Sequence, residues 1–204
     1  MLDDIPSYLN PYRKAARSHG DGFATLLWAS PQTQAVRFDA IARIVDMHGR
    51  LACDAGCGRA DLLDYLRRRG IEPLDYVGIE AIELLAAAAE RKAGPGVRII
   101  RGDFIREPVK LFVGAEVVIF SGSLNTVADA EFYPTLRRAF DATAWTLVFN
   151  FLSSDDLAGA EHLYWRPSAE VEQFVRTLGA AEIRVDDRYL SGDCTIAVMK
   201  EDPG

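Results

Sequence analysis

The sequence is poor in cysteine and histidine, and it has no long hydrophobic run. Its 204 residues include three cysteines, Cys53, Cys57 and Cys194, and three scattered histidines. An odd cysteine count does not indicate a disulfide framework. A zinc site at Cys53 and Cys57 would need further Cys or His ligands, which are missing nearby. We therefore expect small, buried cysteines and no metal site.

No stretch approaches the roughly 20 apolar residues that a transmembrane helix needs. The first residues, "MLDDIPSYLNPYRK", carry acids and prolines where a signal peptide would have an apolar core. These two absences predict a cytoplasmic protein with no membrane partner.

Positive charge is also scarce, because 23 Lys and Arg residues stand against 30 Asp and Glu residues, a formal net charge of −7. A protein that binds duplex nucleic acid usually has a basic face. We therefore expect no DNA partner. An acidic protein is compatible with a small or cationic substrate.

Segments typical of strands alternate with segments typical of helices. The predicted strands are 51–54, 75–80, 97–103, 115–123, 143–153, 181–190 and 193–200, and the predicted helices are 12–19, 31–49, 59–69, 81–93, 130–140 and 168–179. Alternation of this kind indicates an α/β fold with a parallel sheet. The last two strands have no helix between them and should pair as an antiparallel hairpin, with the reversed strand at the edge.

The predicted fold is thus a Rossmann-like, doubly wound, seven-stranded sheet, mostly parallel, with a C-terminal antiparallel hairpin and helices on both faces. Pro134 should lie in the first turn of its helix, where proline is tolerated. Ser168 is a plausible N-cap residue for the last helix.

A glycine turn follows the first predicted strand, at "DAGCG", residues 54–58. Gly56 and Gly58 would let the chain turn tightly and let a ligand approach the backbone. A dinucleotide site requires G-x-G-x-x-G, but Asp61 stands at the third glycine position and Asp54 precedes the first. Both acids would repel a pyrophosphate. They suit a ligand with an ammonium and a sulfonium group and no phosphate, such as S-adenosyl-L-methionine (SAM).

Four consecutive motifs resemble those of class I SAM-dependent methyltransferases: "LACDAGCGRADLL", "YVGIE", "IIRGDF" and "VVIFSGSLNT". The resemblance covers roughly residues 32–200. It implies that Asp54, Gly56 and Gly58 line the methionine and ribose part of SAM. It also implies that Glu80 binds the ribose hydroxyls, with Ala81 beside it. Asp103 and Phe104 would contact the adenine, and Ser121 would lie near the methyl group.

More narrowly, "WASPQTQAVRF", "SGSLN", "FNFLS" and "DRYLSGDCT" resemble segments of a group of small bacterial methyltransferases of unassigned substrate. In this resemblance Trp28 is a wall over the cofactor or a packing residue, and Arg37 is a partner of the cofactor carboxylate or a surface charge. Position 60, often Gly in the broad family, is Ala60 here, and helix packing should tolerate the methyl group.

Other interpretations of single residues stay open. Asp54 could cap the next helix, Glu80 could be a solvated strand end, and Asp103 could be a turn acid. Ser121 and Ser123 could be turn residues. Asn150, next to apolar residues, should have a specific hydrogen-bond partner, either backbone or substrate.

The resemblance implies a domain arrangement and an activity. Residues 1–48 would form a helical lid, and residues 49–204 a SAM-binding domain. The enzyme would transfer a methyl group to a small molecule and release S-adenosyl-L-homocysteine (SAH). The alternatives are a protein or RNA methyltransferase, and a SAM-binding protein without transferase activity. Neither a catalytic base nor the oligomeric state can be named from the sequence.

The acceptor pocket would be built from residues 1–50, the loop after residue 121 and the loop of residues 153–167. Six aromatic residues could wall this pocket or could fill the core: Tyr8, Tyr12, Trp28, Tyr133, Tyr164 and Trp165.

Overall fold

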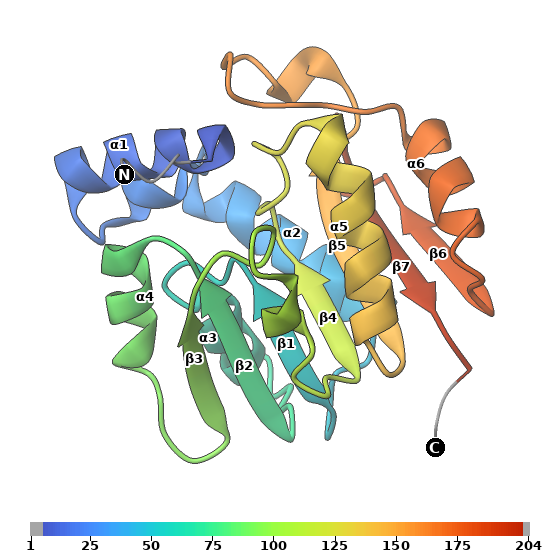
Figure 1. Cartoon of the computed structure of the whole chain (residues 1–204), viewed down its shortest axis with the longest axis horizontal. Helices are drawn as coiled ribbons and strands as arrows, with labels where there is room; N and C mark the ends of the chain where they lie inside the picture. Colours follow the sequence, from blue (N-terminus) through green and yellow to red (C-terminus); the bar gives the residue numbers. More distant parts are fainter. Residues whose placement is uncertain (1–5, 202–204) are drawn as a thin grey trace.

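A computed structural model describes residues 6–201, so residues 1–5 of the predicted lid lie outside the described part. Its strands form one seven-stranded sheet (Figure 1). They are β1 Leu51–Ala55, β2 Asp75–Glu80, β3 Val97–Arg101, β4 Val117–Phe120, β5 Thr146–Leu152, β6 Glu182–Asp186 and β7 Asp193–Met199. The order is β3-β2-β1-β4-β5-β7-β6, and β1 to β5 run parallel. The predicted fold class is confirmed.

The position of the reversed strand differs from the prediction. β6 and β7 form the expected antiparallel hairpin, but the reversed strand, β7, lies between β5 and β6. All seven residues of β7 are buried, whereas β6 is mostly half-buried or exposed. An apolar strand needs sheet neighbours on both sides, and the polar "EIRVD" of β6 suits an edge.

Two α-helices precede the first strand, α1 Asn10–His19 and α2 Pro31–Ile44, and four connect strands: α3 Asp61–Arg68, α4 Glu83–Glu90, α5 Asp129–Ala142 and α6 Ser168–Arg176. Short 3-10 helices are η1 Ser7–Leu9, η2 Phe23–Leu26, η3 Pro108–Leu111 and η4 Asp155–Leu157. None of the helices within residues 6–201 is long and apolar enough to cross a membrane.

Helices cover both faces of the sheet. One core cluster joins α2 and α3 to residues such as Ala52 and Ile119, and another joins α5 and α6 to Cys53 and Phe120. Successive residues of β1 and β4 therefore point to opposite faces, as the pleat requires. The sheet is buried on both sides, so its strand ends are the places where polar groups can collect.

Two helix starts differ from the predictions. Pro134 lies in the second turn of α5, which begins at Asp129. Both Pro134 and Ala130 are exposed, so the Ala130 carbonyl that lacks an N–H partner can bind water. At α6 the N-cap residue is Pro167, whose carbonyl accepts the first N–H, from Glu170 at 3.0 Å, and Ser168 is the first helical residue.

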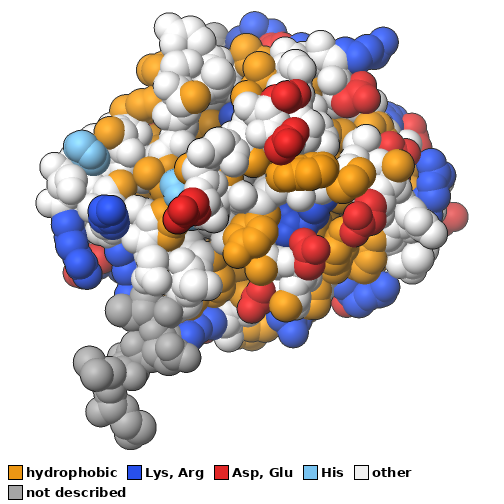
Figure 2. All heavy atoms as spheres, turned by 90° about the horizontal axis from the view of Figure 1, so that it is seen from above, with side chains coloured by type: hydrophobic (Ala, Val, Ile, Leu, Met, Phe, Trp, Pro, Cys, Tyr) orange, Lys and Arg blue, Asp and Glu red, His pale blue; other side chains and the backbone are white. Residues whose placement is uncertain are grey.

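The N-terminal segment, which we define as η1, α1 and η2, lies over the end of the sheet where β1 to β4 end (Figure 1). This confirms a short helix at 12–19, which begins slightly earlier than predicted. The loop before α6 crosses the same end of the molecule. Seen from above, this face shows acidic and apolar side chains near its middle, with Lys and Arg mostly toward its margins (Figure 2).

Candidate ligand-binding site

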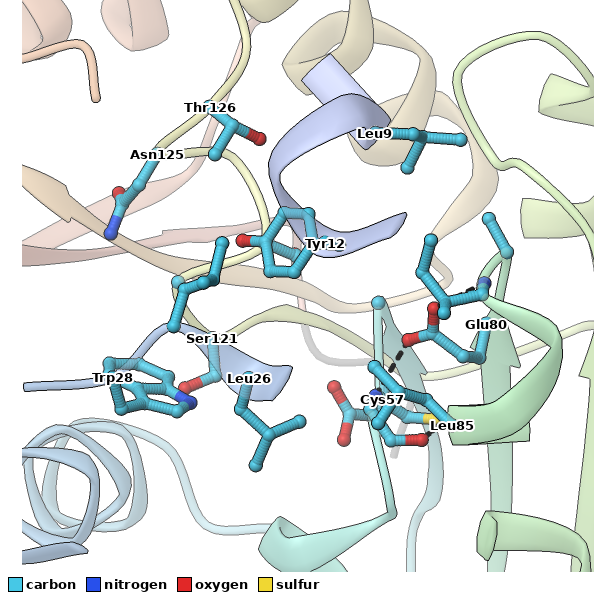
Figure 3. A pocket seen from close by; sticks show the side chains of 18 of the residues that line it. Leu9, Tyr12, Leu26, Trp28, Cys57, Glu80, Leu85, Ser121, Asn125 and Thr126 are labelled. Atoms are coloured by element: carbon cyan, nitrogen blue, oxygen red, sulfur yellow. Dashed lines mark hydrogen bonds between the residues drawn. The ribbon is translucent and has the colours of Figure 1, made fainter. Parts of the chain in front are cut away.

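A pocket open to solvent lies between the N-terminal segment and the carboxyl ends of β1 to β4, with about 990 Å³ of space that includes some of the open solvent. Nine of the ten predicted cofactor-binding residues line it: Trp28, Asp54, Gly56, Gly58, Glu80, Ala81, Asp103, Phe104 and Ser121. Arg37 does not. Glu80 and Leu85 lie on one side, and Trp28 and Ser121 on the other (Figure 3).

The glycine turn after β1 forms the floor of the pocket. Gly56 has φ +80°, and a Cβ on it would lie 2.3 Å from the Cβ of Ser123. The backbone N–H of Gly56 donates to the carbonyl of Ile79 at 2.8 Å, which ties the turn to β2. The Ser123 hydroxyl donates to the carbonyl of Ala55 at 2.7 Å. Only glycine fits at position 56, because both the space and the backbone conformation exclude a side chain.

We expected helix packing to determine whether the methyl group of Ala60 is tolerated, but the backbone conformation of this residue matters more. It is fully buried and takes the left-handed conformation, with φ +57°, as the residue before α3. A non-glycine residue there costs on the order of 1 kcal/mol. The family preference for glycine at this position therefore fits a requirement of the backbone.

Glu80, at the end of β2, is 7% exposed. Its carboxylate accepts backbone N–H groups from Gly58 at 2.8 Å and from Ile82 at 2.7 Å (Figure 3). Burial raises the pKa of Glu80 to about 7, although these N–H groups favour the charged form. It is not a solvated strand end.

Asp54, at the end of β1, is 2% exposed and accepts a hydrogen bond from the Tyr76 hydroxyl at 2.5 Å. Burial raises the pKa of Asp54 to about 7 as well. Within residues 6–201 no Lys, Arg or His forms an ion pair with Asp54 or Glu80. Sequence reasoning missed Tyr76, although it lies on the strand paired with β1.

We predict that Glu80 makes the protein less stable as the pH rises from 5 to 8. The folded-state pKa of about 7 exceeds the ordinary 4.5, so the folded state binds the proton more tightly. The stability from this protonation is present below the unfolded pKa and is lost as the pH rises through about 7. Urea unfolding should show a smaller decline with pH for Glu80→Gln than for wild type. The exposed Glu83→Gln variant should keep the wild-type slope, and equal slopes for all three proteins would contradict the prediction.

Asp103 and Phe104 follow β3. One Asp103 oxygen accepts the N–H of Ile105 at 2.9 Å, as a turn acid would, and the other accepts the Tyr8 hydroxyl at 2.7 Å. Phe104 is 8% exposed and its ring lies 5.2 Å from that of Phe120. Asp103 therefore holds both its own turn and the N-terminal segment.

Arg37 forms a buried ion pair with Asp193, and its Nε donates to Oδ2 of that residue at 2.6 Å. The Tyr189 hydroxyl donates to the same carboxylate, and the Thr195 hydroxyl donates to Tyr189 at 2.7 Å. The guanidinium also lies 4.9 Å from the centre of the Trp28 ring. Arg37 is thus neither a surface charge nor a pocket residue: it joins α2 to the C-terminal hairpin and supports Trp28. This network explains the polar pattern of "DRYLSGDCT".

Asp193→Ala should lower the free energy of unfolding by about 3–5 kcal/mol, because it leaves the guanidinium of Arg37 buried without its partner. Chemical denaturation would measure the loss. Asp187→Ala, in the same hairpin but exposed, is the matched control and should change stability by less than about 0.5 kcal/mol. Equal stabilities of the two variants would show that the ion pair does not hold the hairpin.

Three unpartnered polar atoms lie where β4 and β5 end. Ser121 Oγ, Asn125 Oδ1 and Asn150 Nδ2 are buried without a hydrogen-bond partner in the described structure. The predicted partner of Asn150 is backbone, since its Oδ1 accepts the N–H of Gly122 at 2.8 Å. Ser121 and Asn125 line the pocket.

The loop of residues 153–167 adds Leu163 to the pocket. Arg166 holds this loop down, because its Nη2 donates to the carbonyl of Val127 at 2.6 Å and its Nε donates to Asp129 at 2.8 Å. Of the six aromatic candidates, Tyr8, Tyr12 and Trp28 line the pocket, Tyr133 packs on Phe132 and Phe174, and Tyr164 and Trp165 are exposed.

The three cysteines are free and buried, as expected. Burial raises the pKa of each thiol. In the part of the chain that the structure describes, no group of three or more His, Cys, Asp or Glu side chains is placed to hold a metal ion.

Comparisons with known proteins bear on the fold. No family model matches the chain, and no curated protein matches it in sequence. Among solved structures, magnesium protoporphyrin IX methyltransferase from Synechocystis PCC 6803, with bound SAH, has a TM-score of 0.65 at 16% identity, over 95% of this chain and 97% of that chain. A SAM-dependent methyltransferase from Archaeoglobus fulgidus gives 0.66 at 15% identity, over 84% and 95%. Human N-acetylserotonin methyltransferase with SAM gives 0.68 at 14% identity, over 97% and 61%. The chain has the fold of class I SAM-dependent methyltransferases.

Proposed function

We propose that this chain, with its class I methyltransferase fold, binds SAM and transfers its methyl group to a small-molecule acceptor. One observation carries the proposal: Asp54 and Glu80 are buried carboxylates without a cationic partner, beside a glycine turn in one pocket. Such groups favour a ligand that offers positive charge and O–H or N–H donors. SAM has an ammonium, a sulfonium and two ribose hydroxyls. It carries one carboxylate, on its methionine part, but it lacks the phosphates that these acids would repel.

The residues present fit this cofactor. Glu80 would accept the ribose hydroxyls, Asp54 and the turn at Gly56 and Gly58 would lie along the methionine part, and Asp103 and Phe104 would hold the adenine. A Cβ on Gly56 would collide with Ser123, so the glycine lets the loop after β4 pack against the turn beside the pocket. No Lys or Arg lines the pocket within the described residues, so the site offers no binding group for a pyrophosphate.

SAM, when bound, would supply the methyl group on its sulfonium sulfur, and the rest of the cofactor would leave as a neutral thioether. The protein's task is therefore mainly positioning and exclusion of water. The buried acids and the glycine turn orient one reactant. The N-terminal segment covers the pocket, with Leu26 packed near Gly58, and Trp28, which follows the segment, packs against Gly122. Tyr12 does not act as a base at neutral pH, because burial and the charge of Glu80 raise its pKa to about 12.

A small acceptor is favoured by the shape and charge of the face around the pocket. The pocket is covered by short segments, α1, η2 and the loop with Leu163. Basic side chains lie mostly at the margins of this face (Figure 2). A nucleic-acid substrate would need them along its path.

Titration calorimetry with SAM and SAH should give binding in the micromolar range, and NAD should give none. Glu80→Ala should weaken SAH binding by about 1.5–3 kcal/mol, the range for a hydrogen bond to a charged group. The exposed Glu83→Ala variant should bind SAH as wild type does. Heat with NAD but not with SAH would refute the function, and an unchanged affinity of Glu80→Ala would show that β2 does not end at the ribose.

We also propose that residues 6–30 act as a lid. Tyr8 binds Asp103, and Asp21 pairs at 2.5 Å with Arg91, which follows α4. Leu9, Tyr12 and Leu26 also pack on Ile82 and Leu85, and together these contacts hold the segment over the pocket. Hydrogen exchange at residues 8–28 should slow on SAH binding more than exchange in the β6–β7 hairpin. Trp28 fluorescence should change on binding, and Trp28→Phe should lose most of that change. Equal protection of both regions, without a Trp28 response, would identify the segment as permanent packing.

A further inference from the structure

The pocket has a second half, beyond the acids that would bind the cofactor. Asp54 and Glu80 lie at the ends of β1 and β2 and Asp103 follows β3, whereas Ser121 and Asn125 belong to the loop after β4. Figure 3 shows Trp28, Ser121, Asn125 and Thr126 on the side away from Glu80, with the hydroxyl of Tyr12 directed toward them. We name Tyr12, Trp28, Ser121, Asn125 and Thr126 the acceptor end.

Asn125 carries an unused hydrogen-bond acceptor. The residue is 8% exposed, and its Oδ1 is buried without a partner in the described structure. Its backbone is held on both sides, because its N–H donates to Gly122 at 3.3 Å and its carbonyl accepts the N–H of Tyr164 at 2.8 Å. An amide oxygen can only accept. A buried acceptor of this kind favours a ligand that brings a donor.

Ser121 Oγ is the second unpartnered atom in the acceptor end. It lies on the same loop as Asn125, four residues earlier, and lines the same pocket. A hydroxyl can accept a hydrogen bond as well as donate one. The two side chains together can therefore receive a hydroxyl, an amine or an amide N–H of a bound molecule.

The charges around the pocket disfavour a negatively charged acceptor. Within the described residues its lining includes no Lys, Arg or His, but it includes the carboxylates of Asp54, Glu80 and Asp103. The cation nearest to Trp28 is Arg37, which its ion pair with Asp193 neutralises. A carboxylate or phosphate on the acceptor would meet repulsion without compensation. A neutral or cationic molecule meets none.

The walls of the acceptor end are flat. The Trp28 ring is fixed between Arg37, 4.9 Å from its centre, and Gly122, where a Cβ would come within 2.6 Å of the ring. Tyr12 supplies a second aromatic side chain (Figure 3). Rigid aromatic walls favour planar ligands, since stacked or edge-on rings add to the burial of apolar area.

We propose that the acceptor end binds a planar molecule that has an O–H or N–H donor directed at Asn125 and that has no negative charge. The inference rests on the proposed function, because it takes the other half of the pocket as the SAM site. It names the chemical class of the acceptor, which the fold leaves open.

Four matched rings test this class on SAH-loaded protein. p-Cresol has the donor, 4-methylanisole lacks it, tyramine adds a positive charge and 4-hydroxybenzoate adds a negative one. Ligand-observed NMR titration should give affinities for p-cresol and tyramine that are about tenfold or more above those for the other two. Asn125→Leu should bring p-cresol down to the level of 4-methylanisole. Asn125→Asp keeps the acceptor oxygen and should retain the preference for p-cresol over 4-methylanisole.

Calorimetry with SAH separates this inference from the proposed function. Both Asn125 variants should bind SAH within about twofold of wild type, since an affinity change of that size is under 0.5 kcal/mol. Failure of wild type to bind SAH would overturn the function and the inference with it. With SAH bound, tightest binding of 4-hydroxybenzoate, equal binding of p-cresol and 4-methylanisole, or no binding of any ring would overturn the inference alone. Loss of the p-cresol preference in Asn125→Asp would also overturn it.

Discussion

The burial of two carboxylates at adjacent strand ends is the constraint on which the site depends. A buried carboxylate without a cation is costly unless hydrogen bonds compensate. Here Gly58 and Ile82 supply backbone N–H groups to Glu80, and the Tyr76 hydroxyl serves Asp54. The Gly58 N–H can reach Glu80 only because the chain turns back there with φ +57°. The charge at the end of β2 therefore depends on the conformation of the glycine turn.

The wall opposite these acids comes from segments distant in sequence, and its two ends are held differently. Trp28 stands on the buried network of Arg37, Asp193 and Tyr189, which links it to the C-terminal hairpin. The start of the N-terminal segment is held by the hydrogen bond from Tyr8 to Asp103 and by apolar packing of Leu9 and Tyr12 on Ile82. One end of this wall therefore depends on a buried ionic network, and the other depends on apolar packing and a hydrogen bond.

Local pattern was enough to predict the parts of the fold that local residues determine. β2 spans the predicted residues 75–80, and the strand-end acids gather as parallel strands require. Local pattern could not predict the partner of Arg37, because Asp193 lies 156 residues away in the sequence. The interior place of β7 was readable in principle, since "DCTIAVM" is far more apolar than "EIRVD". The left-handed Ala60 and the second-turn Pro134 depend on backbone geometry and solvent exposure that composition does not show.

Within the described residues, both halves of the pocket lack a cationic side chain. The acids at the ends of β1 and β2 and the unpartnered Asn125 oxygen all accept hydrogen bonds, and the described lining contains no cation to answer them. Arg37 does not supply this positive charge, because its guanidinium is paired with Asp193 in the core. Its connection to the pocket is its contact with the Trp28 ring. A molecule that shares this space with the acids is therefore favoured when it brings a positive group or an N–H or O–H donor. SAM meets this condition with its ammonium and sulfonium groups, and the carboxylates of the pocket would act against a further anion beside it.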